Sequence, residues 1–106
     1  MTLQELYDFA LEHECGELTP LSIDTGADRK LWVGNVSVEG DTLYLHAAAT
    51  TQFRNLQTLL TASPNKNVDI IVKNGTDWTV RSPARGETPD GFAKALVLQC
   101  EPLAAA

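Results

Sequence analysis

The stretch Leu31-Trp-Val-Gly-Asn-Val-Ser-Val-Glu-Gly-Asp-Thr-Leu-Tyr-Leu-His46 decides the fold, because it predicts two β-strands joined by a tight turn. Apolar and polar residues alternate on both sides of its Gly-Asp dipeptide, a pattern typical of a two-residue hairpin loop. With that turn, Val36 faces Leu45 across the hairpin, and Asn35 faces His46 on the opposite face. One face of the hairpin is therefore expected to be buried, and the other to be wet or half covered.

The hairpin belongs to a pattern that occurs twice in the chain. Leu3–His46 and Phe53–Cys100 each contain a short amphipathic stretch, a strand, a turn, a strand with a tryptophan and a final apolar strand. The matching positions are Leu3, Leu6 and Ala10 with Phe53, Leu56 and Leu60, Gly26 and Trp32 with Gly75 and Trp78, and Leu43 and Leu45 with Leu96 and Leu98. We therefore predict an α+β fold of two αβββ half-repeats, with two helices on one face of an antiparallel sheet of about six strands.

The two amphipathic stretches are expected to form helices. The first helix should run from Leu3 to about Glu14 and end at Gly16. It should begin with a capping box between Thr2 and Glu5, and the second helix should cover Gln52–Ala62 after a threonine cap. The residues expected on the buried side of the first helix are Leu3, Leu6, Tyr7, Ala10 and Leu11.

The remaining elements follow from apolar runs and turn residues. Further strands are expected at Leu21–Ile23, Val68–Lys73 and Phe92–Cys100, and Asn74-Gly75 is a strong hairpin signal. Ser82–Gly91 holds two prolines and two glycines and is interpreted as a surface loop.

The length of 106 residues suits one domain with a single core. We assign residues 1–101 to that domain, with half-repeats 1–48 and 50–101, and residues 102–106 to a flexible tail. The exposed edges of an open sheet need a cover or a partner. We therefore expect a homodimer, paired through an edge strand or through the sheet face that carries Tyr44 and a tryptophan.

The acidic residues are concentrated near the N-terminus. The net charge is −6, and residues 1–28 contain seven acidic and no basic residues. A nucleic-acid binder needs a basic stripe that displaces counterions, so direct nucleic-acid binding is not expected. An acidic surface of this kind suits a protein partner with a basic surface.

The sequence offers no sign of export or membrane insertion. No apolar run approaches the roughly 18 residues of a membrane span. The N-terminus has neither the basic flank nor the apolar core of a signal peptide. We therefore expect a cytoplasmic protein in which Cys15 and Cys100 are free thiols.

The leading functional hypothesis is a non-enzymatic protein-interaction module. Its partner-binding residues are expected on the acidic first helix and on the charged Pro/Gly-rich loop, because long loops often carry function. These candidates are Glu5, Asp8, Glu12 and Glu14 on the helix, and Arg81, Arg85, Glu87 and Asp90 in and beside the loop.

The first 25 residues resemble small phage- and prophage-encoded accessory proteins. The resemblance is carried by Met1-Thr-Leu-Gln-Glu-Leu-Tyr-Asp-Phe-Ala10, followed by a loop and Pro20-Leu-Ser-Ile-Asp24. It implies a protein made during infection, and an inhibitor of a host defence or nucleic-acid-processing complex is one such class.

One alternative is enzymatic. Ile23-Asp-Thr-Gly-Ala27 resembles the active-site loop of retropepsin-type aspartic proteases, which are homodimers with one aspartate from each subunit. The resemblance implies Asp24 as the catalytic carboxylate, with Thr25 bracing the loop and Gly26 allowing its turn. The competing interpretation is a turn between two strands, where Asp and Gly are favoured.

A second alternative is a small-ligand sensor in which Trp32 and Trp78 line a pocket between the repeats or subunits. No cofactor is expected, because the chain lacks a phosphate-binding glycine-rich loop. No metal is expected either, because its two histidines and two cysteines are not paired at zinc-ligand spacings.

Overall fold

The computed structural model describes residues 1–103 and contains two helices and six strands. In chain order they are α1 (Leu3–Glu12), β1 (Leu21–Asp24), β2 (Leu31–Glu39), β3 (Thr42–Ala48), α2 (Leu56–Ala62), β4 (Asp69–Asn74), β5 (Thr76–Glu87) and β6 (Lys94–Pro102). The α+β class and the αβββ order of each half of the chain are confirmed.

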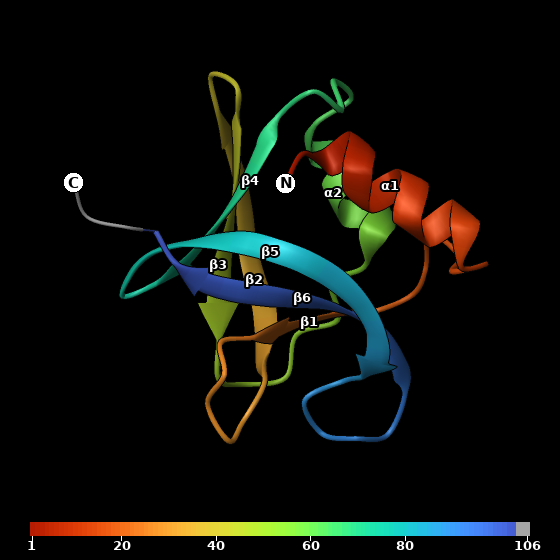
Figure 1. Cartoon of the computed structure of the whole chain (residues 1–106), viewed down its shortest axis with the longest axis vertical. Helices are drawn as coiled ribbons and strands as arrows, with labels where there is room; N and C mark the ends of the chain where they lie inside the picture. The colour runs from red at the N-terminus through yellow and green to blue at the C-terminus, as the bar shows by residue number, and fades with distance from the viewer. Residues whose placement is uncertain (104–106) are drawn as a thin grey trace.

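The sheet closes into a barrel in the order β1-β2-β3-β4-β5-β6 (Figure 1). Pairing is antiparallel within each half-repeat. It is parallel where the halves meet, at β3–β4 and at β1–β6. The predicted sheet of about six mostly antiparallel strands is therefore confirmed, but it is closed and not open, because each half-repeat pairs its outer strands with those of the other half. Closure leaves no terminal strand in the sheet, but β1 covers the edge of β2 only at Leu31 and Trp32, so an edge remains and the homodimer stays a prediction.

The repeat extends to the pairing register. Trp32 pairs with Ala48, the last residue of β3, and Trp78 pairs with Pro102, the last residue of β6. The register then shifts on the middle strand of each half, after Val33 in β2 and after Val80 in β5. Each half-repeat therefore has a β-bulge soon after its tryptophan, and a bulge bends the strand as barrel closure requires.

The bulge in β2 changes one predicted pair of the hairpin. Val36 pairs with Leu45 as expected, but the next pair is Val33 with Ala47. Two residues of β2, Gly34 and Asn35, therefore stand opposite His46 alone, and the predicted Asn35–His46 pair does not form.

Both helices lie on the same side of the barrel, next to each other (Figure 1). Their leucines join the barrel residues in one buried core. The start of α1 is fixed to the chain before β4, because the amide of Leu3 donates to the Val68 carbonyl oxygen at 3.0 Å. The fully buried helix residues are Leu3, Leu6, Ala10, Leu56 and Leu59.

The helix boundaries differ from the prediction. α2 begins at Leu56 because Asn55 caps it, with Asn55 Oδ1 accepting from the Thr58 amide at 3.0 Å. Phe53 therefore lies before the helix and is 79% exposed, so it is not the counterpart of Leu3. In α1 the predicted buried residue Leu11 is 60% exposed, because it lies at the margin of the buried stripe.

The last strands are longer than predicted. β5 continues to Glu87 because its second half pairs with β6, so the predicted surface loop at Ser82–Gly91 was largely wrong. β6 extends to Pro102, and the amide of Leu103 donates to the Asp77 carbonyl oxygen at 3.0 Å. The predicted domain end at residue 101 thus falls within β6, and the predicted tail residues 104–106 lie outside the described residues.

Candidate functional site

The outer side of α1 is an acidic face made of Glu5, Asp8 and Glu12. The three residues are exposed and lie three and seven positions apart, so they share one side of the helix. The buried residues of α1 project from the opposite side. The amphipathic pattern thus turns these carboxylates to solvent, as predicted from the sequence.

No residue of the acidic face takes part in a salt bridge within residues 1–103. Within residues 1–103 there is one salt bridge, between Lys73 Nζ in β4 and Asp77 Oδ1 in β5, at 2.6 Å. None of the seven acidic residues in the first 28 positions has a salt-bridge partner in this part of the chain. Leu11 and Leu18 are 60% and 71% exposed beside these acids, so the surface also offers apolar area.

Glu5 has a structural role as well as a charge. Its Oε1 accepts from the Thr2 amide at 3.1 Å, and its own amide donates to Thr2 Oγ1 at 3.2 Å. These bonds form the predicted capping box. The hydrogen bond from the Thr2 amide is the main reason why the pKa of Glu5 is lowered.

The end of α1 is formed by Glu14 rather than by Gly16. Glu14 has φ of 56°, the left-handed conformation that normally favours glycine. Its amide donates to the Leu11 carbonyl oxygen at 3.3 Å, and the Cys15 amide donates to the Ala10 carbonyl oxygen at 2.7 Å. This is the Schellman arrangement, placed two residues earlier than predicted.

A groove of about 530 Å³, the α1–β5 groove, lies between the end of α1 and the second half of β5. It brings together three of the predicted partner-binding residues, Glu14, Arg85 and Glu87. The other lining residues are His13, Cys15, Thr19, Gly86, Lys94 and Ala95. The groove continues from the acidic face at the C-terminal end of the same helix.

Asp90 lies elsewhere, in the β5–β6 loop. Its Oδ1 accepts from the Thr88 hydroxyl and from the Phe92 amide, and these bonds lower the pKa of Asp90. Asp90 lines a separate 300 Å³ cavity together with Trp32 and Arg29. Trp78 is not among the residues that line this cavity, so the two tryptophans do not share it as the sensor hypothesis supposed.

Asp24, the residue of the protease alternative, ends β1. Its Oδ1 accepts from the Gly26 amide at 2.9 Å, and Gly26 has φ of 85°. These are the features of an Asp-initiated turn. A small cavity of about 170 Å³ is lined by Asp24, Gly26, Arg81, Gln99 and Cys100. Burial, and to a smaller extent the charge of Asp24, raise the pKa of Cys100 to about 12.

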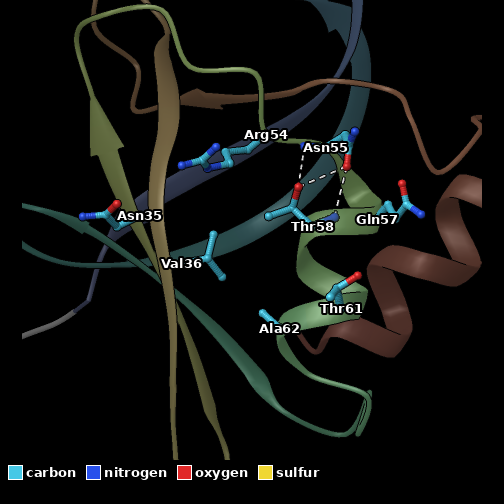
Figure 2. Close-up of a pocket in the computed structure, with 8 residues that line it drawn as sticks. All are labelled: Asn35, Val36, Arg54, Asn55, Gln57, Thr58, Thr61 and Ala62. Atoms are coloured by element: carbon cyan, nitrogen blue, oxygen red, sulfur yellow. Dashed lines mark hydrogen bonds between the residues drawn. The ribbon is translucent and has the colours of Figure 1, made fainter.

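A polar groove of about 560 Å³, the β2–α2 groove, was not expected from the sequence (Figure 2). Asn35 and Val36 of β2 and five residues of and before α2 line it together with Arg54. Figure 2 shows Arg54 reaching back to β2, where its Nε donates to the Gly34 carbonyl oxygen at 3.1 Å. The interruption of the β2 alternation at Gly34-Asn35 was the available signal, because it marks the bulge beside this groove.

Comparisons with protein-family models, with curated proteins and with solved structures gave no match to this chain. None of the helices in residues 1–103 has the length and apolar character needed to cross a bilayer. Within the same residues, no three His, Cys, Asp or Glu side chains are grouped so that they could hold a metal ion.

Proposed function

We propose that this protein is a non-enzymatic interaction module that binds a protein partner with a basic surface through its acidic face. The observation that supports the proposal is that none of the acidic residues in the first 28 positions has a salt-bridge partner within residues 1–103. Unpaired surface carboxylates create a negative field that speeds encounter with a basic partner and orients it.

The apolar part of such an interface is available next to the charges. Leu11 and Leu18 are exposed near the end of α1, and buried apolar area at an interface center contributes most of the affinity. The α1–β5 groove extends the surface with Arg85 and Glu87. The acidic face thus orients the partner, while the exposed leucines and the α1–β5 groove provide the contact area that holds it.

The resemblance of the first 25 residues to phage- and prophage-encoded proteins gives the proposal a specific form. The module would act in the cytoplasm as an inhibitor that occupies a basic surface of a host defence or nucleic-acid-processing complex. Basic surfaces of such complexes bind nucleic acid, and an acidic protein competes for them through the same charges.

The test is affinity capture with two charge-reversed variants of equal net charge. The first variant carries Asp8→Lys and Glu12→Lys on the acidic face and Glu17→Lys at an exposed acid in the segment after α1, and it leaves Glu5 unchanged because the capping box needs that residue. The control carries lysine at Glu39, Asp69 and Glu101, which are exposed residues of the strands. A true partner is retained by the parent and the control, lost by the first variant, and released as salt is raised.

Two results would contradict the proposal. One is a partner that both variants bind as well as the parent does, which would place the interface elsewhere. The other is equal loss with both variants, which would mean that net charge alone attracts the partner. Circular dichroism and thermal unfolding of each variant show whether α1 is intact.

A further inference from the structure

One edge of β2 lacks a strand partner over most of its length. β1 pairs with β2 only at Leu31 and Trp32, so the edge beyond Val33 has no strand beside it within residues 1–103. The carbonyl oxygen of Gly34 accepts a hydrogen bond from Arg54 instead of from a neighbouring strand. Beyond the bulge, the residues up to Glu39 include no proline and one charge, so little prevents an extended chain from pairing there.

The space beside this edge is the β2–α2 groove, which separates β2 from α2 (Figure 2). Its α2 side is lined by four uncharged polar residues: Gln57 and Thr61, and Asn55 and Thr58, whose side chains are bonded to each other in the helix cap. The volume of about 560 Å³ falls within the usual range of ligand sites. A backbone edge on one side and amide and hydroxyl groups on the other suit the polar backbone of an extended peptide.

Arg54 is the charged residue that lines this groove. Its side chain is half-buried, and its Nε already donates to the Gly34 carbonyl oxygen. No carboxylate lies within salt-bridge distance of it among residues 1–103. A guanidinium has five N–H donors in a planar fork, and the donors on its terminal nitrogens match the two oxygens of a carboxylate.

We infer that the β2–α2 groove binds the C-terminal end of an extended peptide, which pairs with the free edge of β2 and places its carboxylate on Arg54. Antiparallel pairing is the more stable arrangement, and a peptide antiparallel to β2 runs from Glu39 toward Gly34. Its C-terminus then arrives beside Arg54. The backbone of Arg54 is fixed at that end, because the Leu21 amide donates to the Arg54 carbonyl oxygen at 3.0 Å.

This binding mode is independent of the acidic face, which lies on α1. Backbone pairing supplies affinity without regard to sequence, whereas the terminal carboxylate selects the end of a chain over its interior. The ligand class is therefore the free C-terminal segment of an extended chain, and not a folded basic surface.

The test uses the peptide N-acetyl-Thr-Val-Thr-Val with either a free C-terminal carboxylate or a C-terminal amide. Each peptide is titrated into the ¹⁵N-labelled protein, and the backbone amide shifts are followed by NMR. The free acid is expected to shift the amides of Val36, Ser37 and Val38 and to bind about tenfold tighter than the amide form, because a hydrogen bond to a charged group is lost in the latter.

Two variants and one control test the assigned contacts. Arg54→Gln should weaken the free acid about tenfold and leave the amide form unchanged. Thr61→Trp changes an exposed residue of α2 and should weaken both peptides by filling the groove. Arg29→Gln removes an exposed arginine elsewhere and should change neither affinity.

Several outcomes would overturn the inference. Equal binding of the acid and amide forms, or equal binding of the free acid by the parent and Arg54→Gln, would show that the peptide carboxylate does not contact Arg54. Sodium acetate that produces the same shifts at the same concentration would reduce the site to a simple anion site. Shifts of the β2 amides that depend on protein concentration alone would assign the edge to a second copy of this chain.

Discussion

Val97 leans toward Gly86 from a diagonal position in the β5–β6 ladder, where Gly86 pairs with Ala95, and a Cβ atom at Gly86 would lie 2.7 Å from Val97 Cγ2. Val97 is buried, and its branched side chain has little freedom to move away. The absence of a side chain at Gly86 is therefore what allows these two strands to approach here.

Gly86→Ala is expected to destabilise the protein by about 1–3 kcal/mol, because the added methyl group overpacks the site. Adding Val97→Ala should recover part of that loss, since it removes the clashing Cγ2 atom. Urea unfolding of both single variants and the double variant measures the coupling. Gly16→Ala is the control, because nothing lies within 4 Å of a Cβ there, and its effect should be small. Additive effects of Gly86→Ala and Val97→Ala would contradict the clash.

The elements of the barrel could be predicted because periodicity and turn residues act locally. The hairpin from Leu31 to His46 and the Asn74-Gly75 turn are set by neighbours in the sequence, and both form, although the bulge in β2 removes the predicted Asn35–His46 pair. Closure depends on the pairing of β1 with β6, whose partner residues are 75 positions apart in the chain, such as Leu21 and Leu96, and no local pattern specifies it. The length of β5 was missed because Pro83 and Gly86 have high turn propensity, which pairing with β6 overrides.

The acidic face could also be predicted, because the side that a helical residue faces follows from its spacing along the helix. The β2–α2 groove could not be predicted from the sequence, because Arg54 lies in the segment before α2 and Gly34 lies in a bulge twenty residues earlier. Only the fold brings them together. Asp90 and Glu14, which the sequence placed in one interface, lie in separate cavities because β5 is a strand and not a loop.

The capping box of α1 should make stability depend on pH through Glu5. Its pKa is lowered in the folded state, so its contribution is fully present above the ordinary carboxyl pKa and is lost as the pH falls through the lower folded value. Glu5→Gln should therefore be less stable than the parent at pH 7, and the difference should shrink in acid. Thermal unfolding across this pH range measures it.

The Thr2→Ala background is the control for the capping box. Thr2→Ala alone should cost about 1 kcal/mol at neutral pH, because it removes the side-chain acceptor of the cap. In that background the additional effect of Glu5→Gln should be smaller and less dependent on pH. An undiminished effect of Glu5→Gln would show that Glu5 acts through some contact other than Thr2.

Glu14→Gly should stabilise the protein by about 1 kcal/mol, because glycine adopts the left-handed conformation without the steric cost that Glu14 bears. Chemical denaturation measures the change. Glu14→Ala is the matched control, since it removes the charge at the end of the helix dipole but keeps the strain. If alanine stabilised the protein as much as glycine does, the gain would come from charge and not from conformation.

Cys100 should react slowly with thiol reagents. Its pKa is raised to about 12, chiefly by burial, so at pH 8 on the order of one thiol in 10,000 is the reactive thiolate. In a Cys15→Ser variant, the rate of maleimide or disulfide-reagent labelling should be far below that of a model thiol. It should rise about tenfold per pH unit between pH 7 and 9. Fast labelling in the folded protein would contradict the assigned burial, and labelling in urea confirms that the thiol is intact.

The two interpretations of Asp24 make opposite predictions for a single substitution. If Asp24 serves its turn, Asp24→Asn should keep the hydrogen bond to the Gly26 amide and change stability little, whereas Asp24→Ala should cost about 1 kcal/mol. If Asp24 is the carboxylate of an aspartic protease, Asp24→Asn should abolish peptidase activity, because the amide cannot share the proton of a carboxylate pair. Measuring unfolding and peptide cleavage on the same three proteins separates the interpretations. If the parent cleaves peptides and the Asp24→Asn variant does not, the protein is an aspartic protease, and the proposal of a non-enzymatic interaction module is wrong.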